Sequence, residues 1–247
     1  MRTKRTYKIP QVLEFKTRLL EWSQQFYEIV WLDSNSHTAA YSSFDAILAV
    51  DALTVLQTDT QNAFENLKEY QGETKDWIFG YLSYDLKNDV EALASNNHDG
   101  VDFPELFFFQ PKKIIKIEGD MVEFNYLNMV IDEIEDDLKA IKNHFQEPYD
   151  EIKTTQDIRI KLRIFKDEYF KGAEEMLRHI HRGDIYEVNY CQEFYVENTL
   201  INPLQTYEKL NAISQTPFAT FLRLNDKYLF SASPERYIRK EGDKIIS

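Results

Sequence analysis

Cysteine is almost absent from this sequence, and glycine and proline are scarce. The 247 residues include one cysteine, Cys191, so no disulfide can form within the chain. This usage is typical of a reducing cytoplasm, where we expect the protein to be located. With 7 glycines and 7 prolines, the chain has little material for flexible linkers. It must therefore fold around a hydrophobic core instead of covalent cross-links.

Long apolar runs and an excess of positive charge are also missing. No apolar run approaches the roughly 20 residues of a membrane-spanning helix. The basic start, Met1–Arg5, is not followed by the apolar region of a secretion signal. Acidic residues outnumber basic ones by 42 to 29, which gives a net charge of −13. An acidic surface repels phosphate backbones, so we expect neither nucleic-acid nor membrane partners, although a locally basic site could still bind a small anion.

The residues that are present predict a globular protein, since 43% are hydrophobic, with 17 Phe and 15 Tyr. In the first part of the chain, helical spacing predicts helices over residues 11–25, 60–71 and 131–145. Strand-forming residues occupy 26–34, 39–53, 77–86, 104–117 and 121–127, with a hairpin turn at Glu118–Asp120.

A polar stretch from Gln146 to Asp157, with Pro148 and no periodicity, predicts a linker. We place it over residues 147–165, between an N-terminal domain (1–146) and the start of a second domain (166–247). The second domain is predicted to hold a helix over 166–181 that Gly183 ends, a long strand over 184–197, a helix over 203–215, and short strands over 218–224, 227–233 and 236–239. Runs of strands with few helices predict an α+β fold with a mostly antiparallel sheet.

The predicted long strand has two distinct faces. Tyr186, Val188 and Tyr190 share its apolar face, whereas Glu187 and Asn189 share the other. Alternation by itself favours an ordinary sheet with one solvated side. The functional alternative is a polar cleft whose floor carries Glu187 and Asn189.

A second informative stretch runs from Ser231 to Tyr237. Its small residues and Pro234 place Glu235 and Arg236 at a constrained turn after a strand. Physical chemistry favours a surface turn with an ion pair worth about 0–1 kcal/mol. The alternative is a positioned carboxylic acid that donates a proton to a leaving oxygen.

The two stretches together resemble the chorismate-binding enzymes. Residues 183–192 are similar to that family's Gly-Asp-Ile-Tyr-Gln-Val-Asn-Leu-Ser-Gln signature, 216–222 to its Ala-Pro-Phe-Ser-Ala-Phe-Leu segment, and 233–237 to its Ser-Pro-Glu-Arg-Phe. Residues 32–34, 41–45 and 80–85 resemble its N-terminal landmarks. The resemblance implies an anthranilate-synthase-component-I-like α+β fold, truncated here, with mostly antiparallel sheets packed face to face and helices outside.

The resemblance also implies a reaction. The 41–45 and Phe218 segments favour amination of chorismate to 4-amino-4-deoxychorismate, a step of para-aminobenzoate and folate biosynthesis. A glutamine amidotransferase subunit would supply the ammonia. Glu187 occupies the position where ammonia-using members usually carry Gln and water-using members carry Lys, which disfavours water-adding chemistry. The alternatives are anthranilate synthase component I, in tryptophan biosynthesis, and a non-catalytic module that binds aromatic amino acids.

Residue roles follow from the same resemblance. Glu235 would protonate the leaving C4 hydroxyl, which requires a desolvated pocket, and a nearby Glu187 would help to keep that acid protonated. Asn189 and Arg236 would line the substrate cleft. An aromatic amino-acid pocket, able to hold tryptophan in some members, would be formed by Ser34, Tyr41, Ser42, Ser43, Phe44, Pro217, Phe218 and Ala219. The family's usual arginine in the Tyr41 segment is Ser43 here, which counts against tryptophan.

Two further expectations concern what the family has beyond these residues. Its Mg²⁺ ligands would follow Ser247, so the 247-residue chain alone should not convert chorismate. Its domains interlock, so apolar surface should be uncovered near Tyr186, Val188 and Tyr190.

Overall fold

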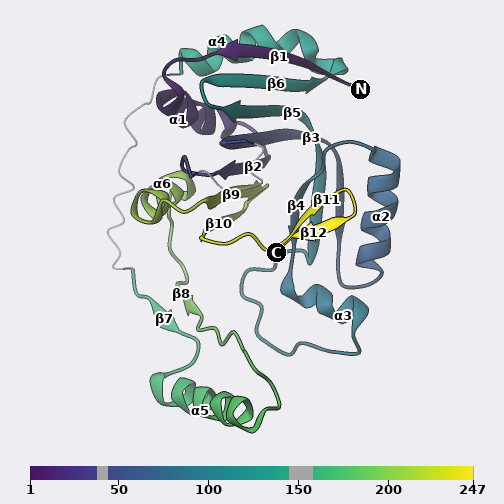
Figure 1. Ribbon diagram of the computed structural model, residues 1–247. Coiled ribbons are helices and arrows are strands. Elements are labelled where there is room, and N and C mark those ends of the chain that lie inside the picture. The colour runs from purple at the N-terminus through teal and green to yellow at the C-terminus, as the bar shows by residue number, and fades with distance from the viewer. Residues whose placement is uncertain (38–43, 145–157, 247) are drawn as a thin grey trace. The chain divides into compact units, whose positions relative to one another are not determined.

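The structure is a computed structural model that describes residues 1–37, 44–144 and 158–246 (Figure 1). It divides into two compact units, of which the larger joins Met1–Pro148 to Pro203–Ser247 and the smaller is Tyr149–Asn202. No helix in the described ranges is long and apolar enough to cross a membrane.

The larger unit is built on one eight-stranded sheet in which every pairing is antiparallel. Its order is β1-β6-β5-β3-β2-β9-β10, and β4 pairs with β5. The strands are β1 (Arg2–Lys8), β2 (Glu28–Asp33), β3 (Ala46–Thr58), β4 (Phe79–Leu82), β5 (Leu106–Glu118), β6 (Met121–Leu127), β9 (Phe218–Leu224) and β10 (Lys227–Ser233). A separate hairpin pairs β11 (Arg239–Glu241) with β12 (Lys244–Ile246). The predicted α+β fold with antiparallel sheets is confirmed.

Helices accompany this sheet, and their apolar faces supply much of the core. They are α1 (Val12–Ser23), α2 (Ala63–Thr74), η1 (Tyr84–Leu86), α3 (Lys87–Val90), η2 (Asn128–Glu133), α4 (Ile134–Lys142) and α6 (Pro203–Ser214). Helix α4 buries Ile134, Leu138 and Ile141, which recur at helical spacing and form its inner face. Helices α1 and α4 pack on each other, and the Tyr207 ring of α6 lies edge-on to Phe221 of β9.

The two longest strands bend at a bulge. The register between β3 and β5 shifts between Ala52 and Thr54, next to Asp51, whose φ is +62°. Bulges increase twist and bend a strand. Beyond the bend, Phe79, Phe107 and Phe109 join Val30 and Leu222 in one buried cluster. Within the described residues, the packing that we predicted between sheets therefore occurs between two parts of one bent sheet.

The predicted domain boundary differs from the structure. Residues 203–247 were assigned to the second domain, but they belong to the larger unit. The physical reason is that β9 pairs with the free edge of β2, with Glu28 opposite Leu224 and Asp33 opposite Ala219. Periodicity reveals a strand but not its distant partner. Most of the predicted linker, residues 147–157, lies outside the described residues.

The smaller unit confirms one prediction and corrects another. Helix α5 (Lys166–Arg182) ends at Gly183, whose φ of +86° lets its N–H bond to the carbonyls of His179 and Ile180. The predicted long strand over 184–197 is wrong. Only β8 (Phe194–Tyr195) forms there, paired with β7 (Lys161–Leu162). Along 184–193 no neighbouring strand is available among the described residues, so the alternation has nothing to pair with.

Part of the apolar side of this segment is uncovered, as expected. Tyr186 is 90% exposed and Val188 is 37% exposed. Tyr190 differs, because its ring stacks on that of Tyr169 with the centroids 4.7 Å apart. Helix α5 also has no buried residue among those described. The exposed apolar surface of this unit contrasts with the buried core that the composition predicts.

Strand β1 was not predicted, because its sequence is almost entirely polar. It pairs with β6 along its whole length, from Arg2 opposite Leu127 to Lys8 opposite Met121. Arg2 is the anchor: its side chain is 8% exposed, and its Nε lies 2.8 Å from the Asp76 carboxylate. A buried ion pair of this kind leaves no signal in a hydrophobicity pattern.

Gly80 is required where β4 meets β5, and this gives a first prediction. A Cβ at Gly80 would lie 1.8 Å from the carbonyl oxygen of Phe107, which cannot move without the strand. We expect Gly80→Ala to lower the free energy of unfolding by about 1–3 kcal/mol, as for other overpacked sites. Urea unfolding monitored by circular dichroism measures this change.

Gly72 provides the matched control for that experiment. It lies in α2, and an added Cβ meets nothing within 4 Å. Gly72→Ala should therefore raise the stability by about 0.5–1 kcal/mol, the cost of glycine within a helix. A Gly80→Ala protein as stable as the unmodified one would show that β4 does not approach β5 this closely.

Candidate functional site

A cavity of about 380 Å³ lies where β2 ends and β9 begins. Five of the eight residues predicted for the aromatic pocket line it, namely Ser34, Phe44, Pro217, Phe218 and Ala219. The other lining residues are Leu32, Asp33, Thr220, Arg236, Ile238, Arg239 and Lys240. Tyr41, Ser42 and Ser43 lie outside the described residues. The structure thus gathers the described members, and their binding role stays a prediction.

Strand pairing brings these distant segments together. Asp33, the last residue of β2, lies opposite Ala219 of β9. Immediately after β2, the Ser34 N–H donates to the Asp45 carbonyl across 2.8 Å. The end of β2, the approach to β3 and the start of β9 therefore meet at one end of the sheet. All of the lining residues belong to the larger unit.

A network of amides fixes the loop after β2 against the loop before β9. Asn35 and Asn211 donate to each other's side-chain oxygens over 2.8 and 2.9 Å. The Asn35 amide also donates to the Thr216 carbonyl over 2.7 Å, next to Pro217 of the cavity. Sequence reasoning missed this pair. The one available signal was Asn35 itself, since asparagine tolerates the left-handed conformation that it adopts here, with φ +48°.

Asp33 is the acid on the cavity wall, and its charge is already compensated. Its Oδ1 accepts from Lys16 Nζ at 2.9 Å and from the Asn35 N–H at 2.8 Å. The side chains of Lys16 and Asp33 are each 10% exposed. A buried pair with this geometry holds α1 against the end of β2.

Basic residues from the segment after β10 form another wall. The guanidinium of Arg236 lies 5.3 Å from the centre of the Phe218 ring, within cation–π range. Arg239 pairs with Glu241, and Lys240 follows it on the wall. We predicted Arg236 for the substrate cleft, whereas here it lines the same cavity as the aromatic pocket residues.

The turn that carries Glu235, the predicted acid, begins opposite Phe218 in the cavity lining. Ser233, the last residue of β10, pairs with Phe218. Its Oγ donates to the Glu235 carbonyl at 2.9 Å and lies 3.2 Å from the Glu235 N–H. These bonds fix the turn, but Glu235 itself is exposed. The described residues therefore do not provide the desolvated pocket that we expected around this acid.

Glu187 and Asn189 lie in the smaller unit, and both are exposed. The predicted approach of Glu187 to Glu235 therefore stays a prediction. The polar face that we assigned to them depended on a strand that does not form. The structure still places Glu187 and Asn189 on one exposed segment.

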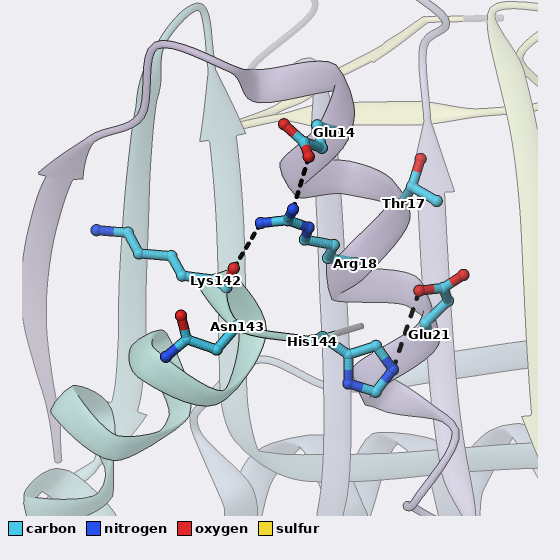
Figure 2. A pocket seen from close by; sticks show the side chains of 7 residues that line it. All are labelled: Glu14, Thr17, Arg18, Glu21, Lys142, Asn143 and His144. Atoms are coloured by element: carbon cyan, nitrogen blue, oxygen red, sulfur yellow. Dashed lines mark hydrogen bonds and ion pairs between the residues drawn. The ribbon is translucent and has the colours of Figure 1, made fainter. Parts of the chain in front are cut away.

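A larger cavity, of about 530 Å³, separates α1 from the end of α4 (Figure 2). Arg18 donates to Glu14 of the same helix at 2.6 Å and to the main-chain carbonyl of Lys142, and His144 Nε2 lies 3.9 Å from Glu21. Sequence reasoning predicted nothing here. The contacts of Arg18 with Lys142 and of His144 with Glu21 link α1 to the end of α4, and we assign the cavity a structural role.

The described residues do not fit a magnesium site. No three His, Cys, Asp or Glu side chains among them gather so that they could hold a metal ion. The chemistry argued below therefore uses only side chains of this chain.

Comparison with known proteins gives a consistent result. A family model described as chorismate binding enzyme matches residues 19–247. Anthranilate synthase component 1 of Buchnera aphidicola subsp. Pemphigus spyrothecae is 28% identical over 179 residues, covering 68% of this chain and 34% of that protein. Aminodeoxychorismate synthase component 1 of Salmonella typhimurium is 37% identical over 78 residues, covering 32% and 17%. The chain spans 34–39% of the length of the anthranilate synthase component 1 proteins that it matches.

The solved structure of anthranilate synthase component I from Streptococcus pneumoniae TIGR4 shares the fold. It superposes with a TM-score of 0.64 at 16% identity, over 85% of this chain and 55% of that one. This likeness supports the arrangement of sheet and helices described above.

Proposed function

The chain belongs to the chorismate-binding enzyme family, and from this premise we propose that it forms part of an enzyme that aminates chorismate. The observation that carries the proposal is the cavity at β2 and β9. Three segments far apart in the sequence, each selected by its resemblance to family motifs, line one cavity. The acid turn of the same family begins directly across the sheet from it.

We propose 4-amino-4-deoxychorismate as the product, made in the cytoplasm for para-aminobenzoate and folate. The support is local: the Salmonella aminodeoxychorismate synthase component 1 is 37% identical over 78 residues, and the Escherichia coli protein is 31% identical over 80. A glutamine amidotransferase partner would release the ammonia. In this reaction, ammonia forms a C–N bond to the ring, and the C4 hydroxyl leaves as water after it receives a proton from Glu235.

Anthranilate formation is the second candidate. Matches to anthranilate synthase component 1 are longer, at 28% identity over 179 residues and 25% over 178 for Thermus thermophilus. A third possibility is that the chain only binds a ligand in its cavity and performs no chemistry. The three functions differ in their products, so a single assay separates them.

That assay gives our second prediction. The 247-residue chain, supplied with chorismate, Mg²⁺ and ammonium, should yield no product above the uncatalysed background, because the described residues hold no metal site. Joined to the C-terminal part of the Salmonella enzyme that it does not span, it should turn over. Chromatography of the products then identifies 4-amino-4-deoxychorismate or anthranilate.

Each result of this experiment decides between the candidates. If the 247-residue chain alone formed product, this would contradict our prediction that it needs a further segment for activity. Anthranilate from the joined protein would select the second candidate. A folded but inactive joined protein, beside an active intact Salmonella enzyme, would favour the ligand-binding module.

A further inference from the structure

The cavity at β2 and β9 has walls that suit a planar ring. Phe218 and Phe44 contribute aromatic surface, and Leu32, Pro217 and Ile238 contribute aliphatic surface. Its volume of about 380 Å³ lies within the range of small-molecule sites. An apolar ring can therefore be desolvated here without displacing any main-chain element.

The polar part of the cavity is positively charged. Arg236, Arg239, Lys240 and the carboxylate of Asp33 belong to its lining. Lys16 pairs with Asp33, and Glu241 pairs with Arg239. Among residues 1–37, 44–144 and 158–246, Arg236 and Lys240 form no ion pair, while both carboxylates are paired. This local excess of positive charge occurs in a chain whose net charge is −13. It favours a ligand carboxylate and disfavours a ligand ammonium.

We propose that this cavity binds an aromatic carboxylate that carries no ammonium group. The ring lies against Phe218 and Phe44, and the carboxylate meets Arg236 and Lys240. Aminobenzoates, whose ring amines are uncharged at neutral pH, belong to this class, whereas a zwitterionic amino acid such as tryptophan does not. The inference rests on the proposed function in one respect: that function identifies the cavity as a ligand pocket.

Three probes with the same ring system test the proposal on the 247-residue chain by calorimetry. Indole-3-propionate carries the carboxylate alone, tryptamine carries the ammonium alone, and tryptophan carries both. We expect indole-3-propionate to bind more tightly than tryptophan, and tryptamine not to bind. 4-Aminobenzoate should bind and compete with indole-3-propionate.

Variants locate the carboxylate. Arg236→Gln should weaken indole-3-propionate about tenfold or more, the usual cost of a lost charge-assisted hydrogen bond. Lys240→Gln, at an exposed position, provides a second variant that should fold normally and also weaken binding. Arg223→Gln is the control, since Arg223 lies on β9 and stacks near Tyr228, outside the cavity lining. It should leave the affinity unchanged.

Tighter binding of tryptophan than of indole-3-propionate would overturn the proposal, and so would equal affinities in the Arg236 and Arg223 variants. The absence of binding by every carboxylate probe would overturn it as well. These measurements involve no turnover, so their failure leaves the proposed amination intact, and an inactive joined protein leaves the binding result intact.

Discussion

Replacing Glu235 with glutamine is expected to lower the turnover number for chorismate amination by about 10²–10⁴-fold. The enzyme to be used is this chain joined to the C-terminal part of the Salmonella relative, with ammonium as the nitrogen source. Glutamine has the size of glutamate but cannot supply the proton that the departing C4 hydroxyl needs. The proton is transferred in the transition state, so KM should change little while kcat falls.

The structure explains why Glu235 can occupy a defined position. Ser233 ends β10 opposite Phe218, and its hydroxyl bonds to both the N–H and the carbonyl of Glu235. Glu235 is exposed in the described structure, whereas a general acid acts best where water is excluded. We propose that a segment of the joined protein supplies this cover, which is why the measurement uses it.

Glu187→Gln is the matched control, because it makes the same chemical change at the other candidate carboxylate. It introduces the glutamine of the family signature that residues 183–192 resemble, so we expect the turnover to change only mildly. If Glu187→Gln lost more activity than Glu235→Gln, the acid would be assigned to the wrong carboxylate. Near-normal turnover in Glu235→Gln would have the same meaning.

Sequence patterns predicted elements well where the signal is local. The helical spacing of Ile134, Leu138 and Ile141 and the stop at Gly183 are both present in the structure. The strands at 218–224 and 227–233 have the predicted bounds. Each of these depends on residues within a few positions of one another.

Patterns failed where a distant partner decides the structure. The alternation over 184–197 is as clear as that of any strand, but only Phe194 and Tyr195 find a partner among the described residues. In contrast, the polar segment Arg2–Lys8 became a strand because β6 offered it a free edge. The same dependence moved residues 203–247 into the larger unit through the pairing of β9 with β2.

The cavity shows what resemblance to family motifs could predict and what it could not. Motif resemblance selected Ser34, Phe44 and Pro217 from separate segments, and the structure brings them together. It did not reveal the amide pair of Asn35 and Asn211 that holds the two loops. A polar pair 176 residues apart has no periodicity to detect.

Lys113 is the buried centre of a charged cluster that joins three elements of the larger unit. It lies on β5 with its side chain 4% exposed, and its Nζ is 2.6 Å from carboxylate oxygens of both Asp137 and Glu133. Asp137 also accepts from the Tyr126 hydroxyl at 2.9 Å. The ammonium lies 5.7 Å from the centre of the Trp22 ring, so it joins β5 to α1 and α4.

We expect Lys113→Ala to lower the free energy of unfolding by about 3–5 kcal/mol, because it leaves a carboxylate buried without its partner. Lys116→Ala on the same strand is the matched control. Lys116 is 28% exposed, and it pairs with Glu118, which is 71% exposed, at 3.5 Å. This control should change stability by only about 0–1 kcal/mol. Urea unfolding at neutral pH measures both variants.

The dependence on pH separates the ion-pair contribution from simple loss of packing. Burial alone would lower the pKa of Lys113, but the hydrogen bonds and charges of Asp137 and Glu133 outweigh it and raise the pKa above the ordinary value of 10.5. A raised folded-state pKa stabilises the fold fully below the unfolded-state value, and this stabilisation is lost as the pH rises through the folded-state value. The stability difference between the unmodified protein and Lys113→Ala should therefore be constant from pH 7 to about 9 and shrink above roughly 10.5. A difference that stays constant through this alkaline range would mean that Lys113 stabilises the fold through its aliphatic packing and not through its charge.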